Sequence, residues 1–354
     1  MKKFFTILVR LLIILLALLG SFLVYISVND YVPPERIRLN VIGPRQDVTA
    51  ETCVFSFFSW NIGYAGLGME MDFFYEGGKQ VRPGEEQLTQ YWQGIGKTLN
   101  KFDSLDFVLL QEVDVRSKRS YFMDQQDSIS GIFSNHYESF AINYDVSVVP
   151  VPLLDPMGTV KAGMMSLSRF KPSEVERIAY PNIAGWPRKL FLPDRCFIYM
   201  RIPAGEKDLL VVNTHNSFYV QEKELRQQEL DILKEFILQE YNKGNYVVAG
   251  GDWNQNPPAL EVDAFSTGDR FEAIMAIEPD FLPPGWKFVY DSSIPTNRQV
   301  DEVYEKASTP TTIIDYFVVS PNVLALEAKT LDLGFENADH QPVIMKVRLE
   351  NEDK

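Results

Sequence analysis

A strand-like apolar run over residues 247–249 stops at two glycines and is followed by a carboxylate and a carboxamide. The charge-free, β-branched run indicates a buried strand, and Gly250 and Gly251 let backbone or ligand approach closely where it ends. Because side chains alternate along a strand, Asp252 and Asn254 are expected to face the same way and to converge on one water, metal ion or phosphate. The alternative is an ordinary Asx turn, in which these side chains bind their own backbone.

The same arrangement recurs, because five further apolar runs end in, contain or lead into polar groups suited to metal binding or proton transfer. These groups are Asn61 after residues 54–60, Gln111 and Glu112 after residues 107–110, Thr214, His215 and Asn216 after residues 209–212, Asp315 within residues 313–319, and Asp339 and His340 before residues 342–345. Six such junctions indicate one shared site rather than six unrelated turns. His136 lies outside this pattern and is expected to be structural.

Taken in order, these blocks resemble the endonuclease/exonuclease/phosphatase superfamily. That superfamily includes apurinic endonucleases, pancreatic-type deoxyribonucleases, neutral sphingomyelinases and inositol polyphosphate 5-phosphatases. The resemblance spans about residues 54 to 349, and the blocks occur in the family order. It implies an α/β fold in which two sheets form a sandwich flanked by helices, a bound divalent cation, and hydrolysis of a phosphate ester at the sheet edge.

Phosphate-ester hydrolysis requires a cation that neutralises the anionic substrate and a water aligned with the leaving oxygen. Glu112 is the best candidate metal ligand, with Asn61 and Asp339 beside it, because Mg²⁺ and Mn²⁺ prefer carboxylate and amide oxygens. Zinc is not expected, since the sequence has no Cys/His spacing of the kind that binds it. We assign Asp252 to orienting or deprotonating the attacking water, and Asn254 to holding that water or a phosphate oxygen.

The resemblance also implies roles for two histidines. His340 is expected to contact the scissile phosphate, while Asp315 accepts its other ring N–H and so fixes the tautomer and raises the basicity, as in the family's acid–histidine couple. His215 occupies the position of the family's second transition-state contact and is expected to donate to a non-bridging oxygen. The alternative for Asp315 is a buried acid satisfied by backbone donors.

The N-terminus carries a separate signal. Residues 11–28 form a charge-free apolar run of about 18 residues, close to the minimum for crossing a bilayer, and residues 4–9 extend it. We expect an uncleaved transmembrane anchor over residues 1–29, with a cleaved signal peptide as the alternative. Lys2 and Lys3 before the run favour a cytoplasmic N-terminus, which places the catalytic part outside the cytoplasm.

Residues 30–50 contain several prolines and are expected to form an extended linker. One catalytic domain is expected over residues 51–354, because the six junctions are spread along it and a cut between two cores would separate them. In an oxidising compartment Cys53 and Cys196 can pair, although the sequence does not show that they meet.

Between the junctions, helices and strands alternate. Helical periodicity predicts amphipathic helices over residues 85–101 and 221–243. Additional strands are expected at residues 139–143, 163–170, 197–202 and 343–349. Many strands and few helices favour sheet-on-sheet packing with the helices outside.

Substrate choice is expected to depend on three long loops, over residues 62–84, 180–195 and 256–312. Their aromatic side chains can stack on a base, cover a lipid or simply pack beneath the loop. Candidate substrate-binding residues are Lys161, Arg169 and Trp186. Arg169 is alternatively a solvated residue at a strand end.

These observations favour a membrane-anchored, divalent-metal-dependent phosphoesterase that hydrolyses a small or lipid-borne phosphodiester or phosphomonoester outside the cytoplasm. The first alternative is an extracytoplasmic nuclease acting on DNA or RNA, which the formal net charge of −14 opposes unless basic residues cluster. The second is a binding module of the same fold without catalysis. The presence of all the candidate catalytic residues argues against this second alternative.

Overall fold

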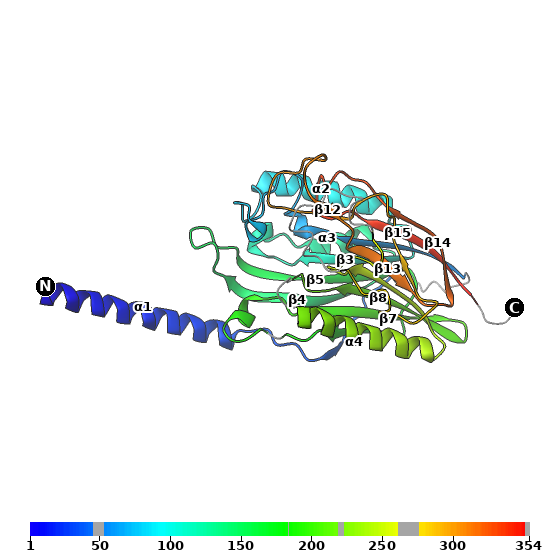
Figure 1. Cartoon of the computed structure of the whole chain (residues 1–354), viewed down its shortest axis with the longest axis horizontal. Helices are drawn as coiled ribbons and strands as arrows, with labels where there is room; N and C mark the ends of the chain where they lie inside the picture. Colours follow the sequence, from blue (N-terminus) through cyan, green and yellow to red (C-terminus); the bar gives the residue numbers. More distant parts are fainter. Residues whose placement is uncertain (45–52, 183, 219–222, 261–275, 351–354) are drawn as a thin grey trace.

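Two β-sheets packed face to face form the body of the protein in the computed structural model, which describes residues 1–44, 53–182, 184–218, 223–260 and 276–350 (Figure 1). The seven-stranded sheet has the order β1 (Arg36–Arg38), β6 (Glu174–Ala179), β7 (Cys196–Ala204), β8 (Lys207–His215), β9 (Tyr246–Asp252), β13 (Asp315–Val319) and β10 (Lys287–Val289). The six-stranded sheet has the order β14 (Val323–Thr330), β15 (Val343–Leu349), β2 (Val54–Asn61), β3 (Phe107–Asp114), β5 (Gly158–Ser168) and β4 (Tyr137–Val149). A two-stranded ribbon joins β11 (Asn297–Arg298) to β12 (Thr311–Thr312).

Helices cover the outer faces of both sheets (Figure 1). They are α2 (Glu85–Lys101) and α3 (Gln125–Ile132) on the six-stranded sheet, and α4 (Lys223–Asn242) on the seven-stranded sheet. The helix α1 (Lys2–Val28) projects away from the body at the N-terminus (Figure 1). The sandwich with outer helices and one apolar N-terminal helix confirms the fold class expected from the sequence.

Three apolar layers result from this arrangement. The central layer lies between the sheets and joins Phe57 and Leu109 of one sheet to Val211, Val248 and Phe317 of the other. Each of these side chains is buried, and burial of one such residue contributes about 1.5–3 kcal/mol. The outer layers lie beneath the helices, where the apolar stripe of each amphipathic helix packs on its sheet.

The strand register places the expected site residues at one end of the sandwich. The pairs β2–β3 and β8–β9 are parallel, so their carboxyl ends lie at the same edge, with Asn61 opposite Gln111 and His215 opposite Asp252. The strand β13 runs antiparallel to β9, and its first residue, Asp315, is therefore also opposite Asp252. Segments far apart in the sequence thus meet at one edge.

The helix expected over residues 85–101 and the strand expected over residues 343–349 are confirmed. The helix expected over residues 221–243 is present as α4, with residues 221–222 outside the described part of the chain. The strands expected at residues 139–143, 163–170 and 197–202 are present as the longer strands β4, β5 and β7. Most of their ends extend further because hydrogen bonding between neighbouring strands continues past the apolar positions, whereas β5 ends at Ser168, two residues earlier than expected.

The segment expected to form an extended linker, residues 30–50, is paired with the body of the protein in its described central part. Residues Arg36–Arg38 form β1, which pairs with β6 at the edge of the seven-stranded sheet. Ile42 makes a further bridge to Glu138 of β4. Prolines do not prevent this pairing, because an edge strand needs hydrogen bonds on one side only.

The two cysteines do not pair. Cys53 is exposed, whereas Cys196 is buried in the central layer, and both are free. A disulfide between them would require the two residues to be neighbours, and the fold separates them.

Candidate active site

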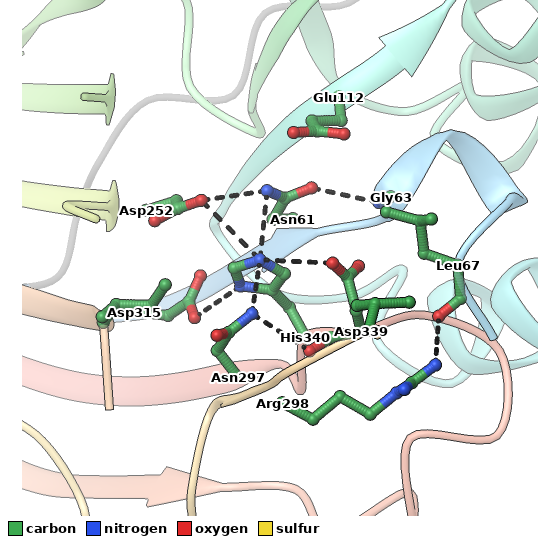
Figure 2. Close-up of polar contacts among 12 residues, drawn as sticks. Asn61, Gly63, Leu67, Glu112, Asp252, Asn297, Arg298, Asp315, Asp339 and His340 are labelled. Atoms are coloured by element: carbon green, nitrogen blue, oxygen red, sulfur yellow. Dashed lines mark hydrogen bonds and ion pairs between the residues drawn. The ribbon is translucent and has the colours of Figure 1, made fainter. Parts of the chain in front are cut away.

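His340 and Asp315 form the most closely joined pair at the shared edge (Figure 2). The His340 Nδ1 atom lies 2.8 Å from the Asp315 Oδ2 atom, and both side chains are buried. The Trp60 indole N–H donates to the His340 carbonyl at 2.9 Å and fixes the backbone. Burial alone would lower the pKa of His340, but the carboxylates of Asp315, Asp252 and Asp339 raise it well above its usual value.

Asp252 lies next to both Asn61 and His340. The Asn61 side-chain N–H donates to Asp252 Oδ2 at 3.0 Å, and the same oxygen lies 3.8 Å from His340 Nε2. The Asn61 oxygen accepts from the Gly63 backbone N–H at 3.0 Å, which fixes the orientation of the amide (Figure 2). Burial raises the pKa of Asp252 to about 6, so this carboxyl is a stronger base than an exposed aspartate.

The alternation that was expected to align Asn254 with Asp252 does not occur. Strand β9 ends at Asp252, and Asn254 has a φ of 50°, so the two residues do not share a strand face. The Asn254 backbone N–H instead donates to Asp252 Oδ1 at 2.9 Å, which is the Asx turn, and its side-chain amide donates to the Asn216 carbonyl at 2.8 Å. Asn254 therefore orients Asp252 through its backbone.

His215 lies across the edge from His340, at the end of β8. Its Nε2 atom is 3.4 Å from Asp252 Oδ2 and 3.7 Å from Glu112 Oε1, so it bridges the two sheets. The Arg195 guanidinium donates to the same ring nitrogen at 2.5 Å. Burial, together with the charges of Arg195 and His340, lowers the pKa of His215 well below its usual value. The two histidines of the site thus differ in charge.

Glu112 reaches the site from an irregular part of β3. The strand does not end after Leu110 as expected but continues to Asp114, with a register shift between Leu110 and Val113. Glu112 adopts a φ of 54°, and its side chain keeps 24% of its surface exposed. Such a bulge re-aims a side chain and is common beside active sites. Figure 2 shows the Glu112 carboxylate beside Asn61, with no dashed line to it.

Glu112, Asp339 and Asn61 carry carboxylate and amide oxygens, which are the ligands that a hard divalent cation prefers. The buried Asp339 Oδ1 has no hydrogen-bond partner among the described residues. Burial raises the pKa of Asp339 to about 7 against the opposing effect of His340, and the charge of Glu112 raises it further. A carboxylate that is buried, partly unsatisfied and close to a like charge is stabilised by a cation.

A second group can also hold a cation. Asp252, Asp315 and His340 bring three ligand atoms within 4.8 Å of one another. However, His340 Nδ1 is already bonded to Asp315, which is the arrangement of a histidine oriented by an acid. Both groups are therefore candidate cation sites, and the oxygen ligands of the first are of the kind that hard divalent cations prefer.

Two residues of the site were missed by sequence reasoning. Arg195 lies directly before β7, and the pairing of Cys196 with His215 brings it to the site. Asn297 comes from the β11–β12 ribbon, and its side-chain nitrogen lies 3.0 Å from His340 Nε2. The position of Arg195 directly before an apolar run could have predicted that it lies at a strand end near the site. Nothing in the sequence indicates the position of Asn297.

A buried amide pair connects the sheets directly behind the site. The Gln111 amide donates to the Asn213 oxygen at 2.7 Å, and Asn213 donates to the carbonyls of Leu110 and Met165. Gln111 belongs to the six-stranded sheet and Asn213 to the seven-stranded sheet, so the bond fixes how the two edges face each other. The amide Gln111 therefore supports the site rather than lining it.

The three candidate substrate-binding residues make contacts elsewhere. Lys161 pairs with Asp145 at 3.6 Å, Arg169 lies 3.9 Å from Asp106, and the Trp186 indole donates to Ser27 at 3.1 Å. None of these contacts joins the cluster around Asp252. The His136 Nε2–H donates to the Leu105 carbonyl at 2.7 Å, as expected of a structural residue.

Comparison with known proteins agrees with this geometry. The model of the endonuclease/exonuclease/phosphatase family matches residues 59–340. No curated protein sequence matches the chain. An endonuclease/exonuclease/phosphatase from Beutenbergia cavernae DSM 12333 shares 16% identity at a TM-score of 0.55, over 84% of this chain and 72% of that one.

Two further solved structures share the fold. ANGEL2, a 2′,3′-cyclic phosphatase in complex with adenosine-2′,3′-vanadate, shares 16% identity at a TM-score of 0.55, over 89% of this chain and 99% of that one. The D. rerio TDP2, complexed with a single-strand DNA product, shares 14% identity at a TM-score of 0.51, over 83% of this chain and 99% of that one. At these identities the likeness shows the fold alone.

Proposed function

Because the chain belongs to the endonuclease/exonuclease/phosphatase family, we propose that it is a membrane-anchored, divalent-metal-dependent phosphoesterase that acts outside the cytoplasm. The observation that carries this proposal is the convergence of acidic, amide and imidazole groups from both sheets around Asp252. Asn61, His215 and His340 all lie within 4 Å of that carboxylate, and Glu112 contacts the same His215 ring.

Glu112, Asp339 and Asn61 would hold the cation, for which Mg²⁺ or Mn²⁺ fits the oxygen donors. When bound, such a cation neutralises the phosphate and polarises the scissile ester. The bulge in β3 keeps the Glu112 carboxylate partly open to solvent. The hydrogen bond from Gly63 to Asn61 fixes the direction of the amide.

The remaining residues would orient the reactants and move protons. Asp252 orients and deprotonates the attacking water, and its raised pKa suits that task. His340, charged and held by Asp315, donates to the scissile phosphate. With substrate bound, the Arg195 guanidinium would turn from His215 Nε2, to which it donates in the free protein, to the phosphate. Neutral His215 could then carry its proton on Nε2 and donate to a second phosphate oxygen. One histidine is charged and the other neutral, which agrees with separate roles.

The N-terminal helix supports anchoring. Helix α1 is long and apolar enough to cross a membrane, although a signal sequence near the N-terminus would pass the same test. We propose an uncleaved anchor with Lys2 and Lys3 on the cytoplasmic side. The net charge of −14 disfavours long nucleic acids as substrates.

A panel of soluble phosphomonoesters and phosphodiesters, assayed with Mg²⁺, Mn²⁺ or a chelator, tests this function. We expect hydrolysis that the chelator abolishes, and a loss of about 10³-fold in Glu112→Gln. Glu327→Gln on β14, an exposed residue away from the site, is the matched control and should keep full activity. Equal activity of Glu112→Gln and Glu327→Gln would remove the site assignment.

Nicking of supercoiled plasmid in the same buffers tests the nuclease alternative. We expect no nicking and no RNA loss under conditions in which the small esters are hydrolysed. Efficient metal-dependent nicking with little ester hydrolysis would replace the proposed function with that of a nuclease.

A further inference from the structure

The loop between β4 and β5 exposes two leucines. Leu153 is 87% exposed and Leu154 is 101% exposed, while Val151 beside them is 38% exposed. Most other strongly exposed large apolar residues belong to α1. Adjacent leucines with no protein cover are costly in water, and such a patch usually marks a contact with another apolar surface.

The same loop is held in place by polar contacts at its base. Asp155 forms an ion pair with Arg82 at 2.5 Å, and the Lys118 ammonium donates to the Pro156 carbonyl at 3.0 Å. The Met157 backbone N–H donates to the Val151 carbonyl at 3.0 Å and closes the turn. The leucines are therefore presented by an ordered turn.

The exit of α1 is fixed to the same end of the body. Ile26 in the last turn of α1 is only 5% exposed, so the helix packs on the domain there. The Trp186 indole donates to Ser27 at 3.1 Å while 60% of the Trp186 surface remains exposed. Figure 1 shows α1 and the β4–β5 loop projecting toward the same side of the molecule.

The catalytic residues face this end as well. Strand β3 runs from Phe107, opposite Ser168, to Asp114, opposite Ala162, and thus toward the loop that precedes Gly158. The pairings of Ala179 with Cys196 and of Cys196 with His215 place the Trp186 loop at the same edge. At about 3.3 Å per residue, Gly158 at the base of the leucine loop lies roughly 16 Å beyond Gly163, the β5 partner of Val113 next to Glu112.

We propose that Val151, Leu153, Leu154 and Trp186 form a surface that rests on the lipid bilayer spanned by α1, so that the catalytic edge faces lipid-borne phosphate esters. This rests on the proposed function for both the anchor and the chemistry. The occupant is the bilayer because the patch continues the end at which α1 leaves the domain. Leucines insert into the apolar region, and tryptophan is favoured at the interface with water. Attachment through α1 also raises the effective concentration of the bilayer at this surface.

Fluorescence from the full chain in phosphatidylcholine vesicles tests the contact without requiring activity. An environment-sensitive dye is placed at Leu154→Cys in a Cys53→Ser background, and nitroxide-labelled acyl chains serve as quencher. The matched control is Glu206→Cys in the exposed β7–β8 turn, at the opposite end of β8 from His215. We expect blue-shifted, quenched emission at position 154 and neither effect at position 206. Equal solvent exposure at both positions overturns the proposal, as does a shift at position 154 that follows protein dimerisation in detergent.

Paired substrates test the consequence for catalysis. The double variant Leu153→Asp, Leu154→Asp is assayed with a phosphate ester on a long-chain lipid in the vesicle and with a short, water-soluble ester. We expect at least about a 10-fold loss on the lipid ester alone, because burial of one leucine is worth on the order of a factor of ten or more. Equal effects on both substrates overturn the proposal. If the unmodified protein hydrolyses neither ester, the proposed function fails, while the fluorescence result still decides the bilayer contact.

Discussion

Two buried acids, one on each sheet, have different hydrogen-bond partners. Asp114 on β3 accepts three hydrogen bonds from the buried Arg119 at 2.9 to 3.2 Å, and the guanidinium also stacks at 3.6 Å on the Tyr64 ring. Asp315 accepts one hydrogen bond from His340, and its Oδ1 atom has no hydrogen-bond partner among the described residues. Both acids are 0% exposed.

The difference distinguishes a structural pair from the pair that we propose to be catalytic. In the Asp114–Arg119 pair every carboxylate oxygen is satisfied within the protein, so nothing remains for a ligand. In the Asp315–His340 pair the ring also faces Asp252 and Asp339. One Asp315 oxygen has no hydrogen-bond partner among the described residues, at the edge where substrate would bind. Both acid–base pairs are buried and charged, so these properties do not distinguish them. They differ in whether every carboxylate oxygen has a hydrogen-bond partner.

The largest effect should come from Asp315→Asn. The change keeps the shape but leaves His340 without its charged partner, so we expect activity to fall by about 10²–10⁴-fold. The loss of stability should be smaller than for a buried arginine left unpaired, because an imidazole can release its proton. Steady-state kinetics on a soluble ester and urea unfolding measure the two effects. Asp106→Asn is the matched control, because Asp106 also accepts hydrogen bonds, from Ser56, but lies away from the site. Similar activities of the two variants would contradict a functional role for Asp315.

The opposite outcome is expected for Asp114→Asn. Breaking a buried ion pair leaves the Arg119 charge uncompensated, so the free energy of unfolding should fall by about 3–5 kcal/mol. The folded protein should retain activity within about twofold, because Arg119 and Asp114 do not contact the Asp252 cluster. Urea unfolding followed by fluorescence gives the stability. The paired change Asp114→Leu with Arg119→Met should recover part of the loss, and a single variant as stable as the parent would refute the structural role.

Glu229 on α4 sharpens the comparison, because it is hydrogen-bonded but forms no close ion pair among the described residues. It accepts from the Ser217 N–H at 2.8 Å and from the Ser217 hydroxyl at 2.6 Å. Burial nevertheless raises the pKa of Glu229 from 4.5 to about 7. Its contribution to stability is therefore full below pH 4.5 and is lost as the pH rises through about 7.

Unfolding midpoints of the parent and of Glu229→Gln, measured from pH 5 to 8, test this sign. The parent should lose stability relative to the variant as the pH rises, by at most about 3 kcal/mol. Parallel pH profiles would show that the Glu229 carboxyl titrates alike in the folded and unfolded chain.

Much of the fold was predictable because it depends on local apolar runs. The strands around residues 54–60, 107–110, 209–212 and 313–319 were visible as runs of β-branched and aromatic residues, and the helix over residues 85–101 as a periodic stripe. The convergence of polar residues at one edge followed from the repeated order of strand and polar group. The proposed roles of these residues stay predictions.

The remaining features depend on register, which the sequence does not encode locally. Asn254 leaves the strand face because its backbone enters the left-handed region, and Arg195 reaches His215 only through the pairing of β7 with β8. The segment at Arg36–Arg38 joins the sheet because β6 offers an open edge. Each of these outcomes requires a neighbour that is distant in the chain.

Because β3 contains a bulge, the position of Glu112 depends on how many residues the strand contains as well as on which residues they are. Val108 and Leu110 pack in the outer layer beneath α2, and Val113 packs in that layer too, although strict alternation would turn it to the opposite face. The single extra residue restores the apolar face after Gln111 and Glu112. Deleting either residue would shorten the strand to a regular one and direct the remaining acid or amide into a different layer. A frame-preserving deletion of three nucleotides can therefore abolish this site as completely as loss of the carboxylate itself.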